Sequence, residues 1–234
     1  MQLALLMATA SLAFALAAPA AVPGRSMQRM PQPRPSVPQT PPPPPVPLAA
    51  SVDVIITTTQ GPIQVQLDGA HAPLTSANFL AYVDARRFDG SSFYRAMKIG
   101  DEGEYGLVQG GLRGDPRRIY KAVAHEASSV TGLSHVDGTI SMARAEPGSA
   151  TADFFIVVGN LTTLDASASD PGYAVFGKVT SGMDVVRRML ELPRSDTAPV
   201  EAMKGQMLAE PVKILSVRRA PPAPAATPPT TPAP

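Results

Sequence analysis

Apolar and polar residues alternate with a period of two through much of the middle of the chain, as is typical of strands with one buried face. Residues 52–59 and 63–67 alternate in this way on either side of Gln60-Gly61-Pro62, a turn-forming triplet, so together they predict an antiparallel hairpin. Six further runs rich in β-branched and aromatic residues predict strands at residues 92–97, 107–110, 139–143, 154–158, 173–179 and 212–217. The pattern therefore predicts eight short strands.

Two segments carry a helical period instead. Residues 75–87 repeat apolar side chains such as Phe79 and Val83 behind a Thr/Ser start, and residues 182–192 repeat Met, Val and Leu. Strands that outnumber two isolated helices, with no regular alternation of strand and helix, favour a barrel over a doubly wound sheet. We therefore expect a mainly β fold, a closed eight-stranded antiparallel barrel capped by two α-helices.

The N-terminal segment, residues 1–22, is an apolar run rich in Ala and Leu that contains the small-x-small sites Ala15-Leu16-Ala17 and Ala18-Pro19-Ala20. This composition predicts a signal peptide for export and, with it, a periplasmic location. The segment has no Lys or Arg and approaches the length that spans a bilayer. The alternative interpretation is therefore an uncleaved membrane anchor.

Proline-rich sequence borders the predicted domain on both sides, with ten prolines between Pro31 and Pro47 alone. Successive prolines fix φ and remove N–H donors, so we expect a disordered linker over residues 23–50 and a disordered Pro/Ala/Thr tail over residues 220–234. The linker is either a spacer that tethers the domain to a membrane or cell wall, or a ligand for a proline-binding module, and composition favours the spacer. The folded domain is expected to span residues 51–219.

Charge and cysteine content exclude several classes of function. The chain has 20 Lys and Arg against 19 Asp and Glu, which gives no electrostatic reason to expect a nucleic-acid partner. It has no cysteine, which excludes disulfides, zinc ribbons, iron–sulfur clusters and thiol nucleophiles. His71, His125 and His135 are at least ten residues apart, so we expect caps, salt links or solvated loops rather than a metal site.

Three predicted strands each combine apolar residues with one polar group: Phe93-Tyr94-Arg95, Leu107-Val108-Gln109 and Asp153-Phe154-Phe155. On a regular strand, residues two apart project to the same face, so Phe93 and Arg95 are expected to share one. If these strands are neighbours, they form an apolar pocket with one guanidinium and one amide, which is the general form of a ligand site. The alternative is an edge-strand arginine that covers apolar surface.

At these residues the sequence resembles the cyclophilins, in particular their bacterial, exported branch. Val108-Gln109-Gly110-Gly111 and Asp153-Phe154-Phe155-Ile156 are among the motifs that carry the resemblance. The full series of matching segments is residues 59–67, 72–80, 88–95, 108–111, 137–144, 153–156, 164–165 and 174–179. The resemblance implies an eight-stranded barrel with a helix at each end. It also implies peptidyl-prolyl cis-trans isomerase activity on proline-containing polypeptides, without a cofactor or metal, in a protein that we expect to be a monomer.

The resemblance also assigns two catalytic residues, Arg95 as the catalytic arginine and Gln109 as the pocket glutamine. The residues that it places around the proline are Phe93, Leu107, Phe155, Leu164 and Tyr173, and those whose backbone it places along the peptide are Ala143, Arg144 and Ala145. Tyr94 and Asp153 are also assigned to the substrate-binding site, although the sequence departs from the common pattern at both, where many members have His and Gln, respectively. Further departures are Gly106, Thr163 and Tyr173.

Rotation about an Xaa–Pro bond breaks no covalent bond, so it needs no nucleophile or proton shuttle. An arginine donor aimed at the prolyl nitrogen would stabilise the twisted transition state over either planar isomer. The main prediction is therefore an exported isomerase that assists protein folding. The alternatives are a module on the same barrel that binds proline peptides without turnover, and a structural domain whose proline-rich ends carry the function.

Overall fold

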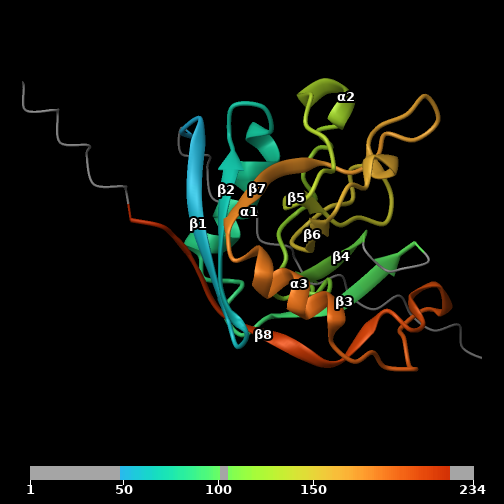
Figure 1. Ribbon diagram of the computed structural model, residues 1–234. Coiled ribbons are helices and arrows are strands. Elements are labelled where there is room, and N and C mark those ends of the chain that lie inside the picture. The colour runs from blue at the N-terminus through green and yellow to red at the C-terminus, as the bar shows by residue number, and fades with distance from the viewer. Residues whose placement is uncertain (1–47, 101–104, 222–234) are drawn as a thin grey trace, which may run out of the picture. The chain divides into compact units, whose positions relative to one another are not determined.

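A computed structural model describes residues 48–100 and 105–221 of the chain (Figure 1). Eight strands form a closed barrel in the order β1-β2-β7-β5-β6-β4-β3-β8, and β8 pairs with β1 to close it. All neighbouring pairs are antiparallel. The strands are β1 (Ser51–Thr58), β2 (Gly61–Asp68), β3 (Ser92–Ile99), β4 (Tyr105–Gly111), β5 (Thr139–Met142), β6 (Phe154–Val158), β7 (Val175–Ser181) and β8 (Met207–Arg219). The closed eight-stranded antiparallel barrel expected from the sequence is confirmed.

The alternation in the first hairpin sends every second side chain into the barrel. Val54 pairs with Val65 across β1 and β2, and both are fully buried. The turn is shorter than expected, because Gly61 and Pro62 already belong to β2. Gly61 has φ of +125°, a conformation that residues with a Cβ rarely adopt, and its carbonyl accepts a hydrogen bond from Thr58 Oγ1 at 2.7 Å.

Two longer helices, α1 (Pro73–Asp84) and α3 (Met183–Glu191), pack their apolar faces on the barrel interior. The helix α1 begins two residues before the expected start, at Pro73, because proline is tolerated in the first turn of a helix. It ends before the expected Arg87, and Arg86 has φ of +54°. The short elements α2 (Ser128–Thr131), η1 (Thr162–Leu164) and η2 (Glu201–Met203) lie in the connections.

The interior is organised around aromatic rings. Phe79 of α1 lies 5.0 Å from Phe88 and 5.4 Å from Phe154, measured between ring centroids. Phe93 contacts Phe154 edge to face at 5.6 Å and is fully buried. Burial of each such side chain contributes about 1.5 to 3 kcal/mol, so this cluster holds β3, β6 and α1 together.

The predictions for residues 1–22, for most of residues 23–50 and for residues 222–234 lie outside the described residues. Within residues 48–100 and 105–221, no helix has both the length and the apolar composition to cross a membrane. The first strand begins at Ser51 and the last ends at Arg219.

Candidate active site

Strand register brings the predicted site residues into one row on the outer face of the barrel. Arg95 of β3 pairs with Gln109 of β4, and Gln109 in turn pairs with Phe155 of β6. Phe155 then pairs with Ser141 of β5. Directly paired residues of antiparallel strands have their side chains on the same face, about 4.5 to 5.5 Å apart at Cβ. The three strands are therefore neighbours, which is the condition on which the pocket expected from the sequence depends.

A second apolar cluster, separate from the interior one, lies on this outer face. Its members, called the outer cluster below, are the buried Leu107, Phe155, Val157 and Leu161, with the partly buried Met97, Ile99, Ala143, Leu164 and Tyr173 packed against them. Phe155 is only 3% exposed, although it points away from the barrel interior. The edge of its ring meets Tyr173 at a centroid distance of 5.5 Å. The predicted residues Leu107, Phe155, Leu164 and Tyr173 thus lie together.

The prediction that Phe93 and Arg95 share a face is wrong. The register of β3 shifts between these two residues against both β4 and β8, which marks a bulge at Tyr94. One extra residue in the strand breaks the two-residue alternation. Phe93 therefore points into the barrel interior and does not line the outer cluster, whereas Arg95 points outward beside Gln109.

Amide oxygens hold the guanidinium of Arg95. Its Nη1 donates to Gln109 Oε1 at 2.8 Å, and its Nε and Nη2 both donate to Gln206 Oε1, at 2.9 and 2.6 Å. Nη2 also lies 3.5 Å from the sulfur of Met97. Burial lowers the pKa of Arg95 from its ordinary value, but an arginine remains charged in a protein. No carboxylate of the described residues pairs with this cation.

A chain of hydrogen bonds extends from Arg95 through Gln109 to the two departures noted in the sequence. Gln109 Nε2 donates to the Tyr94 hydroxyl at 2.7 Å, and that hydroxyl donates to Asp153 Oδ1 at 3.2 Å. The Asp153 carboxylate also accepts the backbone N–H groups of Arg113 and Gly114, at 2.8 and 3.2 Å. Burial raises the pKa of both Tyr94 and Asp153. The Tyr94 hydroxyl and the Asp153 carboxylate are therefore hydrogen-bonded partners in this buried network.

His135 lies beneath the outer cluster, a position that the sequence did not indicate. Its ring is fully buried and stacks on Phe155 with 5.9 Å between centroids and 12° between planes. Nδ1 lies 2.6 Å from Asp165 Oδ1, and Nε2 lies 3.0 Å from Ser141 Oγ. Burial lowers the pKa of His135 and outweighs the opposing effect of Asp165. The buried ring is therefore not in a solvated loop, and it is joined to Asp165 by a hydrogen bond in which the neutral form of the ring is favoured.

This Asp–His–Ser arrangement does not amount to a nucleophilic site. Ser141 is fully buried and pairs with Phe155 within the barrel wall. A nucleophile must reach its substrate, so a hydroxyl enclosed in this way has no access to one. The hydrogen bonds to Asp165 and Ser141 instead fix the orientation of the His135 ring, on which Phe155 stacks.

The segment after β5 flanks the cluster, as expected for Ala143, Arg144 and Ala145. The N–H groups of Ala143 and Ala145 are already bonded, to Asp153 O at 2.8 Å and to Ser149 Oγ at 3.1 Å. A peptide would therefore have to use other groups of this segment. The Arg144 guanidinium lies 4.7 Å over the Tyr173 ring and donates to Gly172 O at 3.0 and 2.7 Å.

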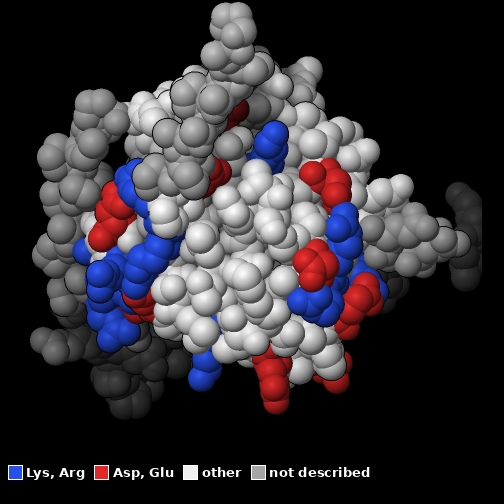
Figure 2. Space-filling model, turned by 60° about the vertical axis from the view of Figure 1, so that its left-hand side comes forward, with Lys and Arg blue, Asp and Glu red and all other residues white. Residues whose placement is uncertain are grey.

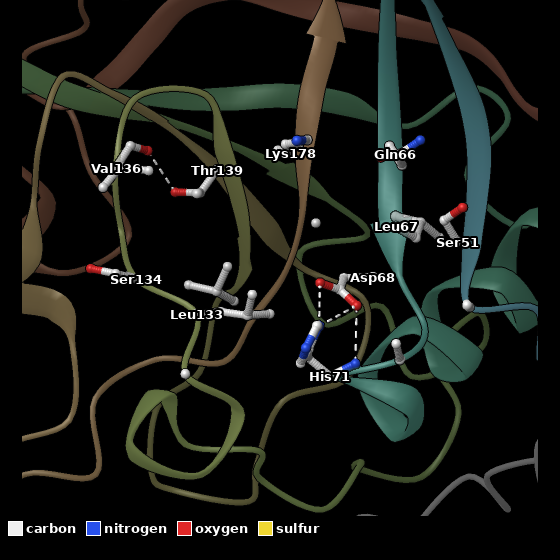
Figure 3. Close-up of a pocket in the computed structure, with 15 residues that line it drawn as sticks. Ser51, Gln66, Leu67, Asp68, His71, Leu133, Ser134, Val136, Thr139 and Lys178 are labelled. Atoms are coloured by element: carbon white, nitrogen blue, oxygen red, sulfur yellow. Dashed lines mark hydrogen bonds and ion pairs between the residues drawn. The ribbon is translucent and has the colours of Figure 1, made fainter.

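One cavity of the described part of the chain lies away from the outer cluster. A cavity of about 440 Å³ between β2 and residues 132–136 is lined by Leu133, Val136 and Lys178, and there the His71 ring is bonded to Asp68 at 2.9 Å (Figure 3). It contains none of the predicted site residues. The face in Figure 2 shows basic and acidic side chains next to one another around a wide uncharged area. The described residues contain no group of three side chains suited to a metal.

Comparisons with known proteins show what the chain is similar to. The family model for cyclophilin type peptidyl-prolyl cis-trans isomerases matches residues 53–219. A peptidyl-prolyl cis-trans isomerase of Acinetobacter baylyi is 35% identical over 170 residues, which cover 72% of this chain and 86% of the relative. Peptidyl-prolyl cis-trans isomerase A of Dickeya dadantii is 36% identical over 154 residues, covering 64% and 77%.

Among solved structures, a cyclophilin type isomerase of Cryptosporidium parvum superposes with a TM-score of 0.55 at 20% identity, covering 73% of this chain and 98% of that one. The structure determined in the presence of the dipeptide Ala-Pro gives a TM-score of 0.56 at 21% identity, covering 72% and 99%. At this identity the likeness shows the shared barrel alone.

Proposed function

Because the chain belongs to the family of cyclophilin-type peptidyl-prolyl cis-trans isomerases, we propose that Arg95 carries this activity on proline-containing polypeptides that have left the cytoplasm. The observation that supports the role of Arg95 is its environment. It is a half-buried cation held by amide oxygens of Gln109 and Gln206, in the row that contains Phe155. No carboxylate of the described residues neutralises it.

In this proposal Arg95 stabilises the transition state electrostatically. Amide resonance opposes rotation of the Xaa–Pro bond with a barrier of about 18 to 20 kcal/mol. As the bond twists, the prolyl nitrogen becomes pyramidal and recovers a lone pair. An N–H of the Arg95 guanidinium would donate to that lone pair, which is present only in the twisted state, and so would bind the transition state more strongly than either planar isomer.

The arginine has one N–H donor to spare for this role. A guanidinium has five N–H groups, of which Gln109, Gln206 and Met97 engage four. The remaining N–H of Nη1 has no acceptor among the described residues. A charge-assisted hydrogen bond contributes about 1.5 to 3 kcal/mol, which is less than the roughly 7 kcal/mol needed for a 10⁵-fold acceleration.

The outer cluster supplies further binding energy. Burial of a methylene group contributes about 0.8 kcal/mol, so enclosing the three ring methylenes of a prolyl residue would contribute about 2.4 kcal/mol. Phe155 offers a rigid surface for that ring because His135 and Tyr173 hold it from two sides. A fixed ring orientation also removes part of the entropic cost of reaching the twisted state.

The location proposed for this activity is the periplasm, where the enzyme would assist the folding of exported chains. Support comes from residues 1–22, whose Ala-rich apolar sequence and small-x-small sites resemble a cleaved export signal. The N-terminal residue of the protein recovered from a periplasmic extract tests this. A product that begins near residue 21 or 23 is expected, whereas a product that retains Met1 in the membrane fraction would favour an anchor.

A protease-coupled assay on an Xaa–Pro peptide tests the activity and the role of Arg95 together. We expect the wild type to accelerate isomerisation, and Arg95→Ala to lower kcat/KM by about 100-fold, equivalent to about 2.7 kcal/mol. Arg117→Ala is the matched control, because Arg117 is 80% exposed and pairs only with Asp115. No acceleration by the wild type would refute the catalytic function, and peptide binding without acceleration would support the non-catalytic module. Equal rates for wild type and Arg95→Ala would refute the role of Arg95.

A further inference from the structure

We infer that Gln206 is a positioning residue that holds the Arg95 guanidinium in its catalytic orientation. This inference rests on the proposed role of Arg95. Gln206 lies 111 positions from Arg95 in sequence, in the connection between α3 and β8. Both Nε and Nη2 of Arg95 donate to its side-chain oxygen, at 2.9 and 2.6 Å.

Backbone hydrogen bonds around Gln206 place its side-chain oxygen next to Arg95. Its carbonyl accepts the N–H of Ala96, the residue after Arg95, at 2.9 Å. Its own N–H donates to Met203 O at 3.0 Å, across the end of η2. Gly205 makes the turn with φ of +70°, which residues with a Cβ rarely adopt. The connection between α3 and β8 is thus hydrogen-bonded to β3 at the residue next to Arg95.

The side-chain amide of Gln206 has a fixed orientation. Its Nε2 donates to Ala202 O at 3.0 Å, so that Oε1 is the atom turned toward Arg95. Exchange of the two ends would place an NH₂ group against a guanidinium and leave donors facing donors. Gln109 holds Nη1 on the other side of the guanidinium. Two amides therefore fix the plane of the cation between them.

Neutral acceptors suit this task better than carboxylates. An amide oxygen orients a guanidinium through hydrogen bonds but leaves its positive charge available for the prolyl nitrogen. A carboxylate in the same place would form a bidentate ion pair and offset that charge. The geometry therefore predicts that replacing the Gln206 amide by a carboxylate harms catalysis, although the carboxylate would hold Arg95 more strongly.

Three variants separate this role from packing. Gln206→Met keeps the length of the side chain and removes the acceptor, and Gln206→Glu keeps the acceptor and adds a charge. Gln60→Met is the control, since Gln60 is exposed in the β1–β2 turn. We expect Gln206→Met to lower kcat/KM about tenfold, mainly through kcat, and the control to match wild type.

Gln206→Glu has nearly the same shape as the wild-type side chain, so its rate is a readout that a packing role would not move. Isomerisation is measured by NMR exchange spectroscopy between pH 8 and pH 4, and the rate is divided by that of wild type at each pH. A glutamate titrates near 4.3, and lower beside a guanidinium. We expect a ratio of about one tenth or less throughout this range, because the carboxylate stays ionised beside the guanidinium and offsets its charge.

The position of Arg95 is also observed directly. Its Nε–H signal should move in Gln206→Met, whereas that of Arg144, which donates to Gly172 O, should not. A kcat/KM of Gln206→Met within twofold of wild type, an unmoved Arg95 signal, or a Gln206→Glu ratio near one at neutral pH would overturn the inference. An inactive wild type would instead refute the proposed function, and the Arg95 signal would still test the contact.

Discussion

The hydroxyl of Tyr94 joins the two halves of the hydrogen-bond chain behind Arg95, and Tyr94→Phe removes it with little change in shape. Gln109 Nε2 would lose its acceptor at 2.7 Å, and Asp153 Oδ1 would lose a donor at 3.2 Å. Gln109 is only 7% exposed, so water cannot easily replace the lost partner. A buried polar group left unpaired costs about 1 to 3 kcal/mol, which is the decrease in unfolding free energy that we expect.

The effect of Tyr94→Phe on catalysis should be smaller than that of losing the arginine. With Nε2 free, the Gln109 amide can rotate and withdraw its oxygen from Arg95 Nη1, now 2.8 Å away. Gln206 still holds the other side of the guanidinium. We therefore expect kcat/KM to fall by about three- to tenfold, or about 0.7 to 1.4 kcal/mol, rather than the 100-fold predicted for Arg95→Ala.

Urea denaturation and the protease-coupled assay measure the two effects of Tyr94→Phe separately. Tyr105→Phe is the matched control, because Tyr105 is 43% exposed and should change neither quantity. Unfolding free energy within 0.5 kcal/mol of wild type, together with unchanged kcat/KM, would show that the hydroxyl does not support Gln109. A loss of stability alone would mean that Gln109 keeps its orientation without Tyr94.

Two further predictions concern stability. Burial keeps the pKa of His135 below its ordinary 6.5 in the folded state, so the unfolded chain binds more protons below that pH. Unfolding free energy from urea titrations should therefore fall as the pH drops from about 6.5 to 5.5, and His135→Gln should reduce this slope; an unchanged slope would contradict the assignment. Glu126 accepts the N–H of Thr75 at 2.7 Å at the start of α1, which lacks a cap from its own N-cap side chain. Glu126→Ala should lower the unfolding free energy by about 0.5 to 2 kcal/mol, and Glu126→Gln should lower it less. Equal thermal midpoints for the wild type and both variants would rule out this capping role.

The strands were predictable where burial alternates regularly and were misplaced where pairing is irregular. The residues expected for β6 are those observed, because every second residue faces a packed interior. The last strand begins at Met207 rather than at residue 212, before a proline that would interrupt a regular ladder. Met207 pairs with Arg95, and Val212 pairs with Phe93. The residues between them, Pro211 included, therefore bulge out of the ladder between β3 and β8. Pro211 thus has no place in that ladder where an N–H donor would be required.

The same limit explains the error at Phe93. An alternation of two assigns Phe93 and Arg95 to one face, and only a bulge at Tyr94 separates them. No residue type in this segment marks a bulge, since glycine and proline are absent from residues 92–99. The choice between core and site at this position therefore depends on pairing with two other strands, which local sequence does not encode.

Gln206 and His135 could not be assigned from local sequence for a different reason. Both act through partners that are distant in the chain or belong to connections without periodicity. Gln206 follows a short 3₁₀ turn, and His135 precedes β5. A polar residue in such a segment is usually solvated, and only the closed barrel brings one against Arg95 and the other under Phe155. Sequence reasoning proposed groups that would contact a substrate, and it did not find Gln206 and His135, which support them.

The support around Arg95 also accounts for the two departures at Tyr94 and Asp153. A carboxylate in direct contact with the guanidinium would interact with it by about 4 kcal/mol at 4 Å and an effective dielectric constant of 20, and so would offset the charge that catalysis uses. Asp153 is instead separated from Arg95 by Tyr94 and Gln109, and its charge is met by the backbone N–H groups of Arg113 and Gly114. The tyrosine therefore acts as a neutral spacer that lets a buried carboxylate anchor the network without pairing with Arg95, the cation proposed to be catalytic.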